Sequence, residues 1–217
     1  MAKIPNIVLR IASRGVRLKI KYLSHSCFEL SNGKTILIDP FFEGNETAPD
    51  YTGRPDVVLV THEHFDHGAD AARFDCPKVC PPNCDYPNKI EMKIGDKIDV
   101  MGIPIEMINA SHHQSGYPTG YVFEYEGKRI AHLGDTYIDG VSRIENVDIL
   151  FIPIGGHFTM DIDEAIEALK IIQPKMAIPM HYNTFPEIQA DPMEFKEKAE
   201  GEGFHVTVIE IDQEIEQ

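Results

Sequence analysis

The sequence lacks a long apolar run and lacks a recognisable export signal. Nowhere in its 217 residues do about 18 apolar residues follow one another, which is the length that a membrane-spanning helix needs. The apolar stretch within residues 3–10 is too short for a signal peptide. We therefore expect a cytoplasmic protein with no membrane partner.

Positive charge is scarce. The chain carries 20 lysines and arginines against 35 aspartates and glutamates, so its formal net charge is -15 at pH 7. Such a surface repels the phosphate backbone, whose neutralisation supplies much of the affinity of nucleic-acid-binding proteins. We expect a small-molecule substrate and no nucleic-acid partner.

Cysteines are few, and their spacing does not indicate a disulfide framework. Cys76, Cys80 and Cys84 recur at every fourth residue of a proline-rich stretch, but no second pair completes a structural zinc site. Free thiols in a loop are the favoured interpretation of these residues. A redox or regulatory role is the alternative.

The length and composition suit one domain. With 217 residues, of which 42% are hydrophobic, the chain can bury about 70% of the surface of its unfolded form. It contains no repeat and no linker that would divide it. We assign residues 1–17 to an N-terminal appendage and residues 18–217 to a single domain. The appendage is apolar enough to pack on its own domain or on a second copy, so a homo-oligomer is left open.

Strand-like runs outnumber helices. Apolar or alternating runs predict strands at 16–23, 26–30, 35–39, 56–61, 97–100, 105–109, 120–125, 129–132, 148–153, 176–179 and 205–211. Asp161 and Asp191 can cap two predicted helices, at 162–172 and 192–200. Because strands and helices alternate in the last third of the chain, we expect a layered α/β fold.

The strongest chemical signal is a cluster of four side chains that bind metals, all within six residues: His62, His64, Asp66 and His67. It follows an apolar strand and precedes a short helix of small residues expected at 68–72. Alternate side chains of an extended segment point the same way, so His62 and His64 can reach one ion. Asp66 and His67 lie where the chain turns and can face a second ion close to the first.

This spacing resembles the HxHxDH signature of the metallo-β-lactamase superfamily, and the resemblance covers about residues 18–211. It implies an α/β fold of the four-layer αββα sandwich type, with two mixed β-sheets flanked by helices and a two-metal site at the sheet edges. It also implies three further ligands at strand ends, in chain order a histidine, a bridging aspartate and a final histidine. The sequence offers His112, Asp135 and His181.

Carried over residue by residue, the resemblance implies two ligand sets. His62, His64 and His112 would hold the first ion, Asp66, His67 and His181 the second, and Asp135 would bridge them. His112 is preferred to His113 because the family's Ala-x-His pattern ends on it, and because neighbouring strand residues face opposite sides. Imidazole and carboxylate ligands suit zinc, with manganese, iron or nickel as alternatives.

Two such ions would turn a shared water into hydroxide near neutral pH and polarise the bond under attack. The implied catalytic residues are Asp66 and Asp135, with His157 as a candidate proton donor to the leaving group, since it follows a strand end in a glycine-rich loop. A packing or capping role for His157 is equally open, and the same holds for His25. The sequence thus predicts a binuclear metal-dependent hydrolase of a small ester, lactone or phosphodiester.

The flanking segments narrow the resemblance. Residues 24–28, 37–41, 118–121 and 180–186 look like those of the UPF0173 group of metal-dependent hydrolases, which is close to the ascorbate-6-phosphate lactonase type. Asp39 would hold the outer N–H of a ligand histidine, or else form a turn before proline. His25, Asn183 and Thr184 would act behind the ligands or touch the substrate, although Asn183 and Thr184 are also suited to closing a turn.

Other classes of function use related scaffolds. A redox di-iron protein usually carries glutamate at the second ligand of the cluster, where this chain has His64. A non-enzymatic metal-binding protein does not need the open coordination positions that this ligand set leaves. A related RNA-processing nuclease usually adds an arm or a domain, for which this chain has neither the length nor the positive charge.

Overall fold

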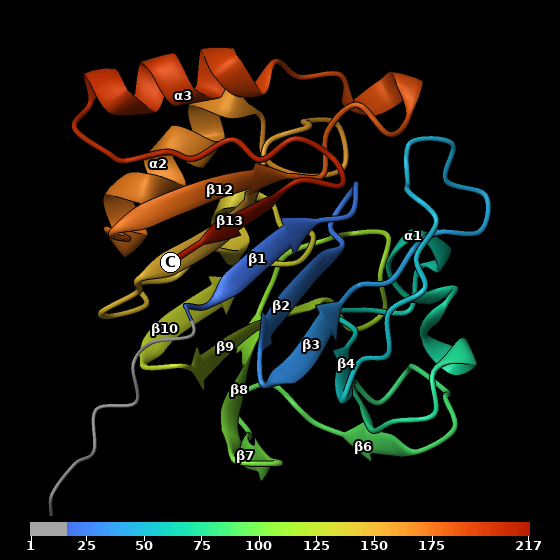
Figure 1. Cartoon of the computed structure of the whole chain (residues 1–217). Coiled ribbons are helices and arrows are strands. Elements are labelled where there is room, and N and C mark those ends of the chain that lie inside the picture. The colour runs from blue at the N-terminus through green and yellow to red at the C-terminus, as the bar shows by residue number, and fades with distance from the viewer. Residues whose placement is uncertain (1–16) are drawn as a thin grey trace, which may run out of the picture.

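Two β-sheets face each other in the middle of the molecule, and helices cover the outer face of each (Figure 1). The structure is a computed structural model that describes residues 17–217. The appendage predicted at 1–17 lies outside the described residues, apart from its last residue. The layers confirm the α/β four-layer αββα sandwich that the sequence predicts.

The first sheet has the strand order β13-β1-β2-β3-β4-β5-β6. Its strands are β1 (Lys19–Tyr22), β2 (Phe28–Asn32), β3 (Lys34–Ile38), β4 (Val57–Leu59), β5 (Lys78–Cys80), β6 (Lys89–Glu91) and β13 (Glu214–Glu216). The pairs from β3 to β6 are parallel, and the pairs that join β13, β1, β2 and β3 are antiparallel, so the sheet is mixed.

The second sheet has the strand order β12-β11-β10-β9-β8-β7. Its strands are β7 (Lys97–Val100), β8 (Ile103–Asn109), β9 (Thr119–Tyr125), β10 (Lys128–His132), β11 (Ile149–Pro153) and β12 (Met176–Met180). β10, β11 and β12 are parallel, while β7 to β10 pair antiparallel in sequence order. β8, β10, β11 and β12 therefore all run in one direction, and their carboxyl ends meet at one edge of the sheet.

The helices cap and pack as their sequences predict. α2 (Ile162–Ile172) begins with a capping box between Asp161 and Glu164, and α3 (Pro192–Gly201) begins with Asp191 as its N-cap. Figure 1 shows α2 and α3 together on one outer face and α1 (Phe65–Gly68) on the opposite side. Short 3-10 turns are η1 (Ala71–Arg73), η2 (Ile138–Gly140) and η3 (Pro186–Ile188). No helix within residues 17–217 combines the length and the apolarity needed to cross a membrane.

Alternation along the strands divides the apolar side chains between the layers. In β11, Ile149 and Phe151 pack in the core between the two sheets, whereas Leu150 and Ile152 pack with the residues of α2 and α3. Such strands are buried on both faces and rich in aliphatic side chains, which is typical of the central strands of layered α/β folds.

All four cysteines, Cys27, Cys76, Cys80 and Cys84, are buried in a third apolar cluster on the outer face of the first sheet. None forms a disulfide. The prediction of free thiols in a loop is confirmed for Cys76 and Cys84, whereas Cys80 is the last residue of β5, and all of these thiols are buried.

Two predicted elements are wrong and three strands were missed. Residues 205–211 form only an isolated bridge between Val206 and Ala177, because the backbone hydrogen bonds of this segment to β12 are the two at Ala177. The helix expected at 68–72 is instead α1 followed by η1. The missed strands β5, β6 and β13 have only three residues each, and proline or charge hides their pattern.

Candidate metal centre

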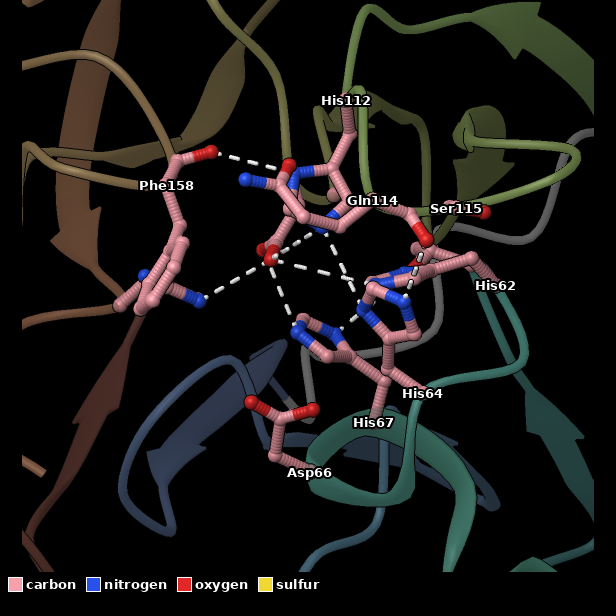
Figure 2. A network of polar contacts seen from close by, with 12 residues as sticks. His62, His64, Asp66, His67, His112, Gln114, Ser115 and Phe158 are labelled. Carbon is pink, nitrogen blue, oxygen red and sulfur yellow. Dashed lines mark hydrogen bonds and ion pairs between the residues drawn. The ribbon is translucent and has the colours of Figure 1, made fainter. Parts of the chain in front are cut away.

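Each predicted ligand follows the carboxyl end of a strand or lies in the turn after it. His62 and His64 follow β4, Asp66 and His67 begin α1, and the other three ligands follow β8, β10 and β12, namely His112, Asp135 and His181. Figure 2 shows the rings of His62, His64, His67 and His112 converging, with Asp66 beside them. The strand directions bring these loops to one place because carboxyl ends of like-directed strands share an edge.

Three histidines form the first ligand group. His64 Nδ1 lies 3.1 Å from His62 Nε2 and 3.3 Å from His112 Nε2. His62 and His112 are buried, and His64 is half-buried at the rim. One nitrogen of each ring thus points at the same small space, which is the arrangement that a tetrahedral metal site with one open position requires.

The second ligand group contains one more residue than the sequence assigned to it. Ligand atoms of His25, Asp66, His67 and His181 all lie within 4.8 Å of one another. His25, His67 and His181 are buried, and Asp66 is half-buried. The structure therefore places His25, predicted only as a supporting or substrate-binding residue, inside the cluster.

Asp135 lies between the two groups. Its Oδ1 is 3.2 Å from His67 Nε2 and its Oδ2 is 3.1 Å from His181 Nε2. The same Oδ2 is 3.9 Å from the inward nitrogens of His62 and His112. One buried carboxylate thus faces both ligand groups.

In His62, His67 and His112, the ring nitrogen that faces away from the other ligands lies within hydrogen-bond distance of an oxygen atom. Asp39 Oδ2 lies 2.8 Å from His67 Nδ1, and the carbonyl oxygen of Phe158 lies 3.1 Å from His112 Nδ1. The Thr61 hydroxyl donates to Asp39 at 2.7 Å and lies 3.1 Å from His62 Nδ1, so its oxygen accepts from that ring. A ring proton held on the outer nitrogen leaves a lone pair on the inner one, as a metal ligand requires.

Electrostatics favour a cation at the centre. Burial alone would raise the pKa of the Asp135 carboxyl, but the His181 and His67 rings hold that pKa well below its usual range. Burial would likewise lower the pKa of His67, yet Asp135 and Asp39 raise it well above its usual value. Burial, helped by His67, lowers the pKa of His62. Asp135 thus stays ionised, and a divalent cation can supply the positive charge beside it that otherwise comes from a protonated His67.

The donor set fits such an ion. Among the described residues, four of the five buried side-chain polar atoms that lack a hydrogen bond belong to this centre: His25 Nε2, His67 Nε2, Asp135 Oδ1 and His181 Nδ1. Buried polar atoms are almost always paired, so such a concentration of unpaired ones indicates a ligand. Imidazole nitrogens and carboxylate oxygens match zinc and neighbouring transition metals.

Two predicted residues lie away from the ligand atoms. His157 is exposed, with its ring against Phe158, and only its carbonyl oxygen is bonded, by the Tyr137 hydroxyl. Asn183 is exposed, and its side chain accepts a hydrogen bond from the Ala190 N–H. The structure places His113, the alternative to His112, on the surface against Tyr137.

Sequence reasoning missed several supporting groups. The carbonyl oxygens of Phe158 and Gln114, which hold His112 and His64, carry no signature because every residue has one. Glu63 was also missed. Its carboxylate accepts from Ser115 and from the Gly116 N–H, and so ties the HxHxDH segment to the loop that carries His112.

A cavity of about 690 Å³ lies near His25, and none of the ligand residues lines it. Asn183, Thr184, Phe185 and Thr47 are among the residues that line it, and Thr184 Oγ1 lies 3.1 Å from His25 Nδ1. The cavity therefore reaches the cluster through Thr184, on the side of His25 that faces away from the other ligand atoms.

Comparisons with known proteins agree with this geometry. The family model described as "Beta-lactamase superfamily domain" matches residues 19–181. The chain is 38% identical over 221 residues to a UPF0173 metal-dependent hydrolase of Thermoplasma volcanium, with 92% of this chain and 99% of that protein covered. The corresponding Pyrococcus abyssi protein is 35% identical, with 92% and 99% covered. The structure of Igni18, a metallo hydrolase from Ignicoccus hospitalis, has a TM-score of 0.81 at 31% identity and covers 91% of this chain and 97% of that one.

A fold, a ligand order and a family match of this extent define a member of the metallo-β-lactamase superfamily. Within that superfamily, the chain belongs to the UPF0173 family of metal-dependent hydrolases. The resemblance stated from the sequence is thereby confirmed.

Proposed function

We propose that the chain hydrolyses a small ester, lactone or phosphodiester with a hydroxide activated by two divalent metal ions. The observation that carries this proposal is the position of Asp135, whose carboxylate faces both ligand groups. Two ions held this close lower the pKa of a shared water and polarise the bond under attack. No serine or cysteine nucleophile is then needed.

The ligands follow from the two groups. His62, His64 and His112 would hold one ion, Asp66, His67 and His181 the other, and Asp135 would bind both. Zinc suits this set best, and manganese, iron or nickel can also occupy it. The hydrogen bonds that the ring N–H groups donate to Asp39, Thr61 and the Phe158 carbonyl keep the inward lone pairs free.

Other residues would handle the substrate. Asn183 and Thr184 line the cavity of about 690 Å³ and are proposed to contact the group that is not being cleaved. His157 belongs to the loop whose Phe158 carbonyl holds His112, and is proposed to protonate the leaving group. Its ring is exposed to solvent.

The proposed setting is a reducing, cytoplasmic compartment, which four unpaired cysteines support. A small-molecule substrate agrees with the size of the cavity, and a net charge of -15 disfavours nucleic acid. Whether residues 1–17 pack on their own domain or on a second copy of the chain stays open.

The test is one assay on metal-loaded protein with a chromogenic phosphodiester and a panel of lactones. Asp135→Ala should lose turnover and retain fewer ions, measured by plasma mass spectrometry. Asp139→Ala removes an exposed aspartate four residues away and should change neither. Turnover that survives in Asp135→Ala would contradict the proposal, as would inactivity on every substrate by protein that holds two ions.

A further inference from the structure

The connection between β1 and β2 holds His25 in a strained backbone. Ser24 has φ 88° and His25 has φ 57°, so two consecutive non-glycine residues adopt left-handed conformations. Cys27 N donates to Ser24 O at 2.9 Å, and the His25 carbonyl accepts from the Tyr22 hydroxyl and from His181 N. Such strain persists only where the surroundings fix it, and it is concentrated at functional sites.

The ring of His25 is oriented as the ligand rings are. Thr184 Oγ1 lies 3.1 Å from His25 Nδ1 and 3.4 Å from the Tyr182 carbonyl, to which the hydroxyl donates. The threonine oxygen therefore accepts the proton on His25 Nδ1, and Nε2 keeps a free lone pair. Thr61 orients the His62 ring in the way that Thr184 orients His25: its hydroxyl donates to Asp39 and its oxygen accepts from the ring nitrogen Nδ1.

The free nitrogen faces the second ligand group. His25 Nε2 is buried, makes no hydrogen bond, and lies 3.4 Å from Asp66 Oδ2. The ring centroid is 4.1 Å from that of His181 and 5.2 Å from that of His67. Zinc holds nitrogen and oxygen ligands at about 2.1 Å, which sets neighbouring ligand atoms about 3–4 Å apart. The spread of at most 4.8 Å among the four ligand atoms is compatible with one ion.

A buried histidine with a purely structural role looks different in this protein. His132 is also buried between the sheets, but both of its nitrogens are used: Nε2 lies 3.0 Å from the Ser26 carbonyl and Nδ1 accepts from Gly134 N. Its ring has no atom left for a ligand. His25 differs by one unpaired nitrogen aimed at two further histidines and a carboxylate.

We infer that His25 is a further protein ligand of the ion held by Asp66, His67, His181 and Asp135. The inference rests on the proposed two-metal function. It gives the second ion four residues of its own in addition to the bridging aspartate, whereas the first has three. We therefore expect the second ion to dissociate from the protein more slowly than the first.

The test uses readouts other than turnover. Asparagine tolerates a left-handed φ better than other non-glycine residues, so His25→Asn keeps the backbone and removes the ring nitrogen. Zinc transfer to a chromogenic chelator should be biphasic in the unaltered protein. In His25→Asn the slow phase should accelerate at least about tenfold, the lower end of what losing a supporting partner of a ligand costs. His205→Ala, an exposed histidine, should leave both phases unchanged.

A spectroscopic count separates a ligand from a structural residue. Cobalt-loaded protein should show six strongly shifted imidazole N–H proton signals, and His25→Asn should show one fewer at unchanged circular dichroism. Thr184→Val retains the ring but removes its anchor, and should retain the sixth signal with faster exchange. Five signals in the unaltered protein, or an unchanged slow phase in folded His25→Asn, would overturn the inference. These readouts do not depend on turnover. A failure of the inference about His25 can therefore be distinguished from a failure of the proposed hydrolase function.

Discussion

Asp39 Oδ2 lies 2.8 Å from Nδ1 of His67, and both side chains are completely buried. The same carboxylate accepts hydrogen bonds from the N–H and the hydroxyl of Thr61. Asp39 follows β3 and Thr61 follows β4, so the parallel pairing of these two strands brings the support next to the ligands. The metal centre is thus built on neighbouring strand ends.

Asp39→Asn should weaken metal binding. The amide retains the shape of the side chain, but it can no longer offer two anionic oxygens to His67 and Thr61. We expect metal affinity to fall about 10–100-fold, measured by competition with a chelator of known affinity. Asp70→Asn is the matched control, because Asp70 is buried and accepts from the Phe42 and Glu43 N–H groups away from the centre. It should lower stability without changing affinity, and equal losses of affinity in the two variants would refute the role given to Asp39.

His112→Ala and His113→Ala should differ sharply. His112 Nε2 faces His64 at 3.3 Å, whereas His113 stacks on Tyr137 at the surface. Protein with His112→Ala should bind about one ion fewer per chain, and His113→Ala should keep the content of the unaltered protein. Metal analysis after gel filtration measures both. A normal metal content in His112→Ala would place the ligand elsewhere.

The candidate ligands could be selected from the sequence, whereas much of the structure that supports them could not. Imidazole and carboxylate side chains are chemically distinct, so His62, Asp135 and His181 could be placed in order by a motif and by strand ends. The carbonyl oxygen of Phe158 that accepts from His112 could not be predicted, because every residue has a backbone carbonyl. Asp39 was left between two roles because only the pairing of β3 with β4 shows that it reaches His67. His25 was undecided for the same reason, since its partner Thr184 lies 159 residues away.

The fold could likewise be predicted where the pattern is local and not where it depends on distant pairing. Strands with several alternating apolar residues were predictable, since each of their faces packs in a separate layer. β13, with the sequence Glu-Ile-Glu, is held at a sheet edge by backbone pairing with β1. The position of β13 depends on β1, which is distant in the sequence, and the residues of β13 alone do not predict a strand.

Gly134→Ala should destabilise the protein more than Gly127→Ala. Both glycines have a left-handed φ, at 60° and 72°, so each substitution costs about 1–2 kcal/mol of backbone strain. A Cβ at Gly134 would collide with the Thr119 carbonyl oxygen, while at Gly127 it would meet nothing within 4 Å. The crowding adds about 1–3 kcal/mol. Urea unfolding of the two variants measures the difference, and equal losses of stability would contradict the close packing around Gly134.

The four thiols should be unreactive in the native protein. Burial raises the pKa of the Cys27 and Cys76 thiols, and the thiolate is the reactive form. Cys80 is the exception, because a hydrogen bond from Cys84 lowers its pKa, but its side chain is completely buried. Ellman's reagent at pH 7 should therefore detect four thiols in guanidinium chloride and almost none within minutes in buffer. Ser142→Cys, at an exposed position, should add one thiol that reacts at once. Rapid labelling of two or more native thiols would mean that the layer beneath α1 and η1 opens readily, and it would revive the redox interpretation of Cys80 and Cys84.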